Sequence, residues 1–155
     1  IGTSPAFYMK VKFTITDVSG LDDLRCGFAK VEAHAADPDD LNDVAAMACM
    51  AGDIKTQTIL TNAETVVTDL TSGGGDGAGN WADTATHTFE IRVSAGGVVT
   101  YLLDNVAPTG AVAYTFTSGL NVTPFWYHIH DGDGTCAIVW QEFEFGLQAN
   151  RTPVA

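Results

Sequence analysis

The stretch that decides the fold class reads His87-Thr-Phe-Glu-Ile-Arg-Val-Ser94, then Ala95-Gly-Gly97, then Val98-Val-Thr-Tyr-Leu-Leu103. In its first segment apolar and polar side chains alternate, the period of two that is typical of a β-strand with one buried face. The glycine pair can adopt the backbone angles of a tight turn, so the stretch predicts an antiparallel hairpin. The positions expected to face a core are Phe89, Ile91, Val93 and Tyr101.

The same alternation occurs near both ends of the chain, at Phe7–Thr16 and at Ala137–Gln148. In an uninterrupted strand, successive side chains point to opposite faces. The last segment therefore has two predicted faces, one with Ala137, Val139, Gln141, Phe143, Phe145 and Leu147 and one with Ile138, Trp140, Glu142 and Glu144. We expect Val139, Phe143 and Phe145 to lie in the same core as the hairpin.

Shorter segments complete an all-β pattern. The weaker strand candidates, separated by Gly, Asp, Asn and Pro, are Gly27–Ala35, Asp53–Leu60, Glu64–Leu70, Ala111–Phe116 and Pro124–His130. One segment is ambiguous: Asp37 and Pro38 could begin a helix, while the apolar run Ala45–Ala51 suits a core strand, which we favour. So many short strands without a long amphipathic helix predict a two-sheet antiparallel β-sandwich of the jelly-roll type, with residues 1–155 as one domain.

The charge balance restricts the class of partner. Seven Lys and Arg residues against nineteen Asp and Glu residues give a formal net charge of −12. Such a charge repels phosphate backbones and anionic lipid, so neither nucleic acid nor a bare membrane is expected as a partner. The acidity either maintains solubility or selects a basic partner surface, and both interpretations stay open.

Cysteines and apolar runs give further expectations. Cys26, Cys49 and Cys136 cannot all pair within one chain, and their spacing matches no zinc or redox motif, so buried thiols are expected. No apolar run approaches the roughly 18 residues that span a bilayer, and no signal-peptide pattern opens the sequence. We therefore expect neither a membrane anchor nor an intact signal peptide.

From Trp81 to Gln148 the sequence resembles the concanavalin A-like, laminin-G-like lectin and glucanase jelly roll. The residues that carry this resemblance are Trp81 with the segment His87–Val93, Gly97–Asp104, Pro124-Phe-Trp-Tyr127 and Ile138–Gly146. Two earlier segments, Cys26–His34 and Gly52–Leu60, look like jelly-roll modules among the structural proteins of tailed bacteriophages. This resemblance implies a capsid decoration or fibre component on the surface of a virion, which binds other virion proteins and copies of itself as a homo-oligomer.

The glucanases of this family carry a Glu-x-Asp-x-x-Glu pattern, which places carboxylates over the substrate on one strand. Here only Glu142-Phe-Glu144 is present, without the Asp or a third Glu, and an outward-facing pair is the favoured interpretation. Neither a Gly-x-Ser-x-Gly elbow nor a phosphate-binding Gly-rich loop occurs. We therefore expect a non-enzymatic protein without a cofactor, with a carbohydrate-binding, lectin-like module as the alternative to the virion role.

The candidate binding residues are aromatic or acidic. Trp126 and Trp140 could each offer a flat apolar face to a sugar or a partner, although core packing is the commoner fate of a single tryptophan. Asp76, Asp131 and Asp133 lie in glycine-rich segments that are expected to be exposed loops at the ends of the sandwich. These loops would contact a basic surface.

The densest polar cluster is His128-Ile-His130-Asp131-Gly-Asp133-Gly134. Its Asp-Gly repeats suit a tight turn between strands, which is the favoured interpretation. The two histidines share one face of a strand, and the following carboxylates could add oxygen ligands. A metal or Ca²⁺ site made of His128, His130, Asp131 and Asp133 is the weaker alternative.

Overall fold

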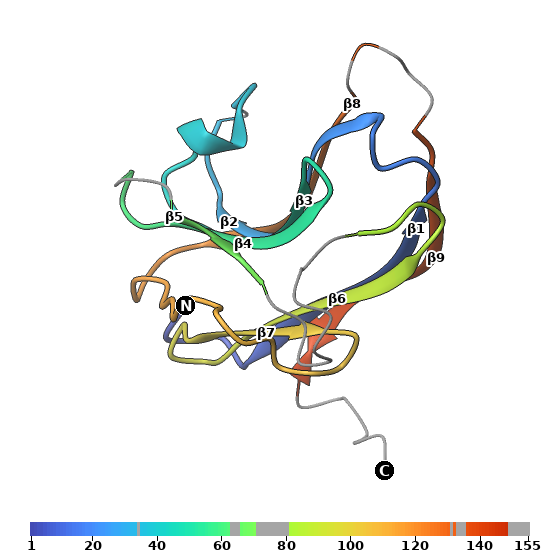
Figure 1. Cartoon of the computed structure of the whole chain (residues 1–155). Helices are drawn as coiled ribbons and strands as arrows, with labels where there is room; N and C mark the ends of the chain where they lie inside the picture. Colours follow the sequence, from blue (N-terminus) through green and yellow to red (C-terminus); the bar gives the residue numbers. More distant parts are fainter. Residues whose placement is uncertain (34, 63–65, 71–80, 131, 133–135, 149–155) are drawn as a thin grey trace.

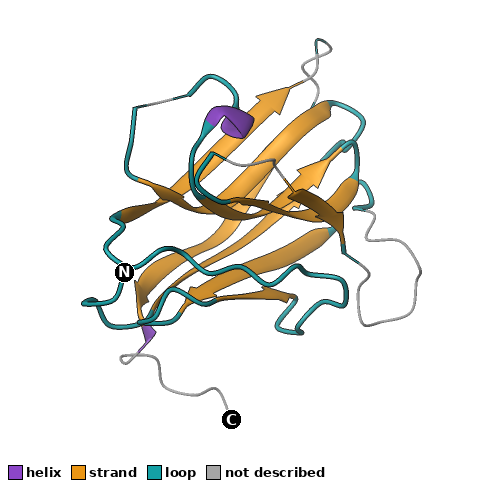
Figure 2. Cartoon of the chain, turned by 90° about the vertical axis from the view of Figure 1, so that its left-hand side faces the viewer, coloured by secondary structure: helices purple, strands orange, loops and turns teal. Residues whose placement is uncertain are grey.

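The computed structural model describes residues 1–148 except 34, 63–65, 71–80, 131 and 133–135. These residues form two antiparallel sheets that face each other, as Figures 1 and 2 show. In spatial order, sheet A contains β7 (Val99–Leu103), β6 (Thr86–Val93), β1 (Phe7–Ile15) and β9 (Ile138–Leu147). Sheet B contains β5 (Val66–Asp69), β4 (Asp53–Ile59), β3 (Val44–Met50), β2 (Leu21–Lys30) and β8 (Val122–His130). The predicted all-β, two-sheet jelly-roll sandwich is confirmed.

The core lies between the two sheets and is centred on Phe13 of β1. Its ring packs on Trp81 and Phe89, at centroid distances of 4.9 and 5.4 Å, and on Trp126 at 5.1 Å. Sheet A directs Met9, Val11, Phe13, Ile15, Phe89, Ile91, Val93 and Tyr101 into this core, and sheet B directs Leu24, Cys26, Phe28, Ala45, Met47 and Cys49. Strict alternation in β1 and β6 therefore predicted the buried side of sheet A correctly.

The segment before β3 combines both readings of the ambiguous sequence. Asp37 caps a 3-10 turn, η1 (Pro38–Asp40), and its side chain accepts a hydrogen bond from the Asp39 backbone N–H. The apolar run that follows is the core strand β3, as favoured from the sequence. The predicted strand at 111–116 is wrong: apart from a single bridge between Val98 and Thr115, it pairs with no strand among the described residues. In the described part of the chain, no helix has the length and apolar character needed to cross a membrane.

The last strand, β9, departs from the predicted alternation. Lys12 of β1 lies opposite Glu142, but the next residue, Phe13, lies opposite Trp140, so Gln141 is the extra residue of a β-bulge. The bulge changes the face of every residue before it. Trp140 therefore faces inward and Val139 outward, which corrects the prediction that Val139 lies in the core.

The thiol prediction is confirmed, since the three cysteines are buried and form no disulfide. Burial raises the pKa of Cys49 to about 12 and raises that of Cys26 still further, so both side chains remain protonated thiols.

Candidate binding site at the open edge of the sandwich

The strands β8 and β9 are the edge strands of their sheets and lie on the same side of the sandwich. Within the described residues, neither has a neighbour beyond it, so the sandwich is open along this side. At one end of the opening the ring of Trp126 from β8 meets that of Trp140 from β9, with centroids 4.2 Å apart. The two predicted tryptophans are thus brought together, one half-buried against Phe13 and the other exposed.

Three aromatic rings follow one another along the inward face of β9. Trp140, Phe143 and Phe145, which we call the aromatic strip, are 44%, 52% and 62% exposed. Adjacent ring centroids in the strip are 5.7 and 6.0 Å apart. The register with β1 places the two phenylalanines on the core-facing side of sheet A, but sheet B does not extend over them. The prediction that Phe143 and Phe145 lie in the core is therefore wrong.

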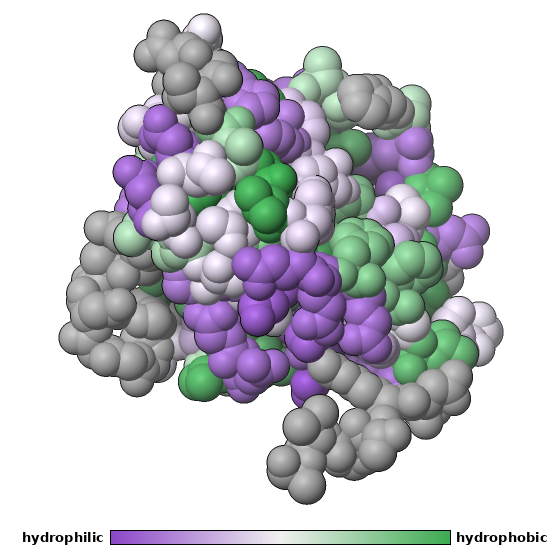
Figure 3. All heavy atoms as spheres, turned by 90° about the vertical axis from the view of Figure 1, so that its right-hand side faces the viewer, coloured by the Kyte–Doolittle hydropathy of each residue, from purple (hydrophilic) through white to green (hydrophobic). Residues whose placement is uncertain are grey.

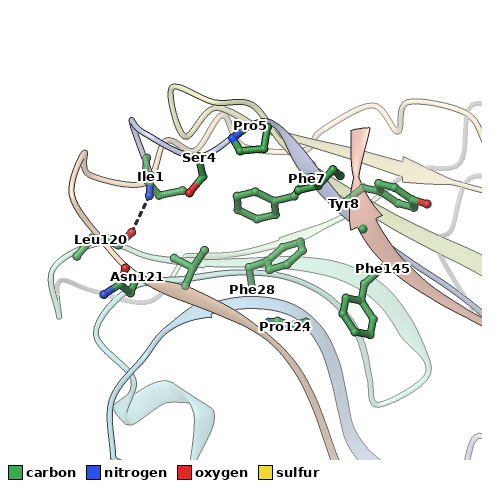
Figure 4. A pocket seen from close by; sticks show the side chains of 13 residues that line it. Ile1, Ser4, Pro5, Phe7, Tyr8, Phe28, Leu120, Asn121, Pro124 and Phe145 are labelled. Atoms are coloured by element: carbon green, nitrogen blue, oxygen red, sulfur yellow. Dashed lines mark hydrogen bonds between the residues drawn. The ribbon is translucent and has the colours of Figure 1, made fainter. Parts of the chain in front are cut away.

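At the other end of the opening, the aromatic strip enters a pocket of about 490 Å³ between the sheets, which we call the edge pocket. Figure 4 shows Phe7 and Phe28 next to each other inside it; their rings meet edge to face, with centroids 4.9 Å apart. Phe145 and Pro124 flank its mouth from β9 and β8. A few polar groups, among them the side chains of Ser4 and Asn121, interrupt this apolar lining, which is the usual composition of a small-molecule site.

The free edge of β9 adds backbone hydrogen-bonding groups beside the aromatic strip. In an antiparallel pair, every second residue of an edge strand directs its N–H and C=O away from its partner. No described strand pairs with this side of β9, so these donors and acceptors face the opening. They can bind either the hydroxyl groups of a ligand or the backbone of another strand.

The carboxylates of β9 lie on the opposite, outward face. Glu142 accepts a hydrogen bond from Lys10 Nζ at 2.8 Å, and Glu144 accepts one from the Tyr8 hydroxyl. Figure 3, which faces this side of the molecule, shows hydrophilic side chains gathered beside hydrophobic ones. Glu142 and Glu144 therefore face outward, as expected, and bind Lys10 and Tyr8 on the side of β9 opposite to the aromatic strip.

The two histidines of the predicted metal cluster share the inward face of β8 with Trp126. The rings of His128 and His130 lie 4.2 Å apart, His128 half-buried and His130 exposed. Burial, with the charge of His130 as a second cause, lowers the pKa of His128, so its imidazole is neutral near pH 7. Asp76, Asp131 and Asp133, the predicted acidic contacts, lie outside the described residues.

A polar network on the outer face of sheet B, with Arg25 and Gln57 buried, was not anticipated from the sequence. The Arg25 guanidinium donates to Asp23 at 2.8 Å and to Asp39 at 2.6 Å, and Gln57 Nε2 also donates to Asp39. Because Asp39 belongs to η1, the network fastens that turn onto the sheet. The available signal was Arg25 within the otherwise apolar run Leu24–Ala29, since such a charge is buried only with partners.

No protein-family model matches the sequence, and no curated protein matches it. Solved structures match its fold at low identity. The carbohydrate recognition domain of Emp47p is 11% identical with a TM-score of 0.63, over 93% of this chain and 72% of that one. Sheep galectin-11, in complex with glycerol, is 9% identical with a TM-score of 0.56, over 94% and 93%.

Alginate lyase PA1167 from Pseudomonas aeruginosa is also similar, at 9% identity and a TM-score of 0.60, and the match covers 93% of this chain but 65% of the lyase. Identities this low carry neither an activity nor a ligand from one protein to another. What the matches show is the architecture: the chain has the jelly-roll sandwich found in galectins and concanavalin A-like lectins.

Proposed function

We propose that this protein is a non-enzymatic carbohydrate-binding module that holds a glycan along the open edge of the sandwich. The observation that carries the proposal is the aromatic strip, three exposed rings in a row that lead into the edge pocket. Flat aromatic faces suit the apolar C–H faces of sugar rings, and their burial by a ligand is favourable. Several sugar units in succession could lie against Trp140, Phe143 and Phe145.

Polar groups at the borders of the strip would bind the hydroxyl groups of the glycan. The free backbone edge of β9 supplies donors and acceptors along its length, and Asn121 lines the edge pocket. A site with a large apolar area and a few polar groups is ordinary for a small-molecule ligand. This arrangement orients a ligand without a charged contact.

The charge of the protein favours a neutral glycan. Glu142 and Glu144 stand on the outward face of the strand that carries the aromatic strip, and the whole chain has a net charge of −12. Sugars with carboxylate or sulfate groups would be repelled over a distance of about one Debye length, roughly 8–10 Å. We expect neutral oligosaccharides to bind more tightly than uronates of the same length.

The free edge of β9 favours a second candidate function, the docking of a strand from another protein subunit. An exposed edge with apolar side chains is the surface used in β-strand addition. Such docking would be an assembly role like the one predicted from the sequence, but without a specified partner or a virion. The solved structures named above include no virion protein, so the location on a virion stays a prediction.

Binding of neutral and uronate oligosaccharides to immobilised wild-type protein, followed by calorimetry on the best ligand, tests the proposal. Trp140→Ala should weaken binding about tenfold or more, because it removes one stacked ring. Val139→Ala is the matched control, since Val139 is 48% exposed on the same strand but faces outward. It should bind like the wild type.

Equal glycan affinity of Trp140→Ala and the wild type would exclude the aromatic strip as the site. Absence of glycan binding, together with oligomers or protein complexes that Phe143→Ala disrupts, would instead support strand docking. Light scattering after gel filtration provides that second measurement on the same variants.

A further inference from the structure

Three potential metal ligands from two segments converge beside the Trp126–Trp140 end of the opening. They are His128 and His130, at alternate positions on β8, and Cys136, which lies two residues before β9. One ligand atom from each, an imidazole nitrogen or the thiol sulfur, lies within 4.8 Å of the other two. We propose that these residues form a Zn²⁺ site that joins the edge strands of the two sheets, a function separate from glycan binding.

The ligand types select the metal. Two imidazole nitrogens and one thiolate form a set that Zn²⁺ binds readily, whereas Ca²⁺ and Mg²⁺ require oxygen ligands. Zinc bonds of about 2.0–2.1 Å to nitrogen and 2.3 Å to sulfur place tetrahedral ligands about 3.3–3.6 Å from one another. No two of these ligand atoms are more than 4.8 Å apart, so the cluster must contract by at most about 1.5 Å. Rotation of the exposed His130 side chain provides part of this movement.

One atom of the cluster already requires a partner. Nε2 of His128 is buried and makes no hydrogen bond among the described residues, which is costly for a polar atom. Coordination to a metal through this nitrogen would satisfy it.

The position of Cys136 decides what the metal would do. Its neighbour Ala137 is tied to the end of β1 by two hydrogen bonds, from Ala137 N to Thr16 Oγ1 at 2.9 Å and from Thr16 N to Ala137 O at 3.0 Å. Cys136 is therefore fixed relative to sheet A, while both histidines belong to sheet B. A bound ion would link the sheets across the opening and hold Trp126 against Trp140, with its fourth position open to water beside His130.

Metal titrations of the reduced, metal-free full chain test the proposal, with Zn²⁺ and with Co²⁺ as a coloured substitute. We expect one equivalent of Co²⁺ to give the visible spectrum of a tetrahedral site together with an ultraviolet sulfur-to-metal charge-transfer band. Cys136→Ser should remove that band. His130→Ala should weaken Zn²⁺ binding about a hundredfold or more, because one of three ligands is lost. Zn²⁺ at a hundredfold excess over Kd should raise Tm of the wild type by about 5–10 °C.

Two substitutions of the same residue types elsewhere are controls. Cys26→Ala and His87→Ala should bind both metals like the wild type, since these residues belong to the core and to a contact with Asp104. Because His130 is exposed, His130→Ala is expected to fold. If Cys136→Ser does not fold, the Zn²⁺ affinity of His130→Ala and the cobalt spectrum of the wild type still test whether the site exists. Absence of the charge-transfer band in the wild type, equal Zn²⁺ affinity of His130→Ala, or a rise in Tm with Ca²⁺ but not Zn²⁺ would each overturn the proposal.

Discussion

The same substitution, phenylalanine to alanine, at Phe89 in the core and at Phe143 on the edge tests whether this edge of the sandwich is open to water. Phe89 is fully buried and packs on Phe13 and Trp81 at 5.4 and 5.6 Å, so Phe89→Ala leaves a cavity and should cost about 3–5 kcal/mol of unfolding free energy. Phe143 is 52% exposed, so about half of its ring is removed from water on folding. Because water can fill the space that it leaves, Phe143→Ala should cost only about 1 kcal/mol.

Urea denaturation followed by tryptophan fluorescence measures both losses on the same scale. Phe143→Ala should lower Tm by only about 2–4 °C, which leaves a folded protein for the glycan assay. Equal losses for the two variants would refute the reasoning, because Phe143 would then be covered in solution by sheet B or by a second copy. Repeating the melts over a range of protein concentrations separates these cases, since only cover by a second copy makes Tm depend on concentration.

Two further predictions concern the frame of the sandwich. Gly27→Ala should cost about 1–3 kcal/mol in urea denaturation, because its Cβ would overlap the Ala45 carbonyl oxygen of β3. Gly96→Ala should change little, because the nearest atom to its added Cβ is Ser94 Oγ at 3.9 Å, an ordinary van der Waals contact. The protein should also lose stability in acid, because the pKa of Asp104 is lowered by folding. Burial alone would raise this pKa, but the contacts of the carboxylate with His87 Nδ1 and the Thr88 N–H, both at 2.7 Å, lower it overall. The unfolded chain then takes up the proton first, so stability is lost as the pH falls below about 4, and Asp104→Asn should flatten that part of the Tm curve; an unchanged curve would contradict this.

The contrast between β6 and β9 explains how much of this structure the sequence could predict. In β6 the alternation is unbroken and the strand has neighbours on both sides, so Phe89 and Ile91 are buried as the pattern indicates. In β9 the alternation also reads as continuous, but a bulge at Gln141 changes the face of the residues before it. A bulge depends on the register with the partner strand, which no pattern within one strand contains.

The candidate sites were predicted only in part, for a related reason. Alternation correctly placed Phe143 and Phe145 on the core-facing side of their strand, but it carries no information on how far the opposite sheet extends. The two tryptophans were found because their ring type is informative by itself. Cys136 was not joined to His128 and His130 because the cluster depends on the crossing from one sheet to the other, which only the structure shows.

The composition of β9 also argues for the kind of ligand that its edge accepts. Exposed edge strands invite pairing between copies, and proteins prevent it with bulges and charged side chains. Here the bulge at Gln141 interrupts the regular pairing of β9 with β1, and Glu142 and Glu144 flank Phe143. In an antiparallel pairing of two copies centred on Phe143, Glu142 would lie opposite Glu144 of the second copy, and like charges opposite each other are destabilising. An edge that discourages its own pairing while it keeps three aromatic rings exposed is better suited to a ligand with neither a strand nor a negative charge, which is what a neutral glycan provides.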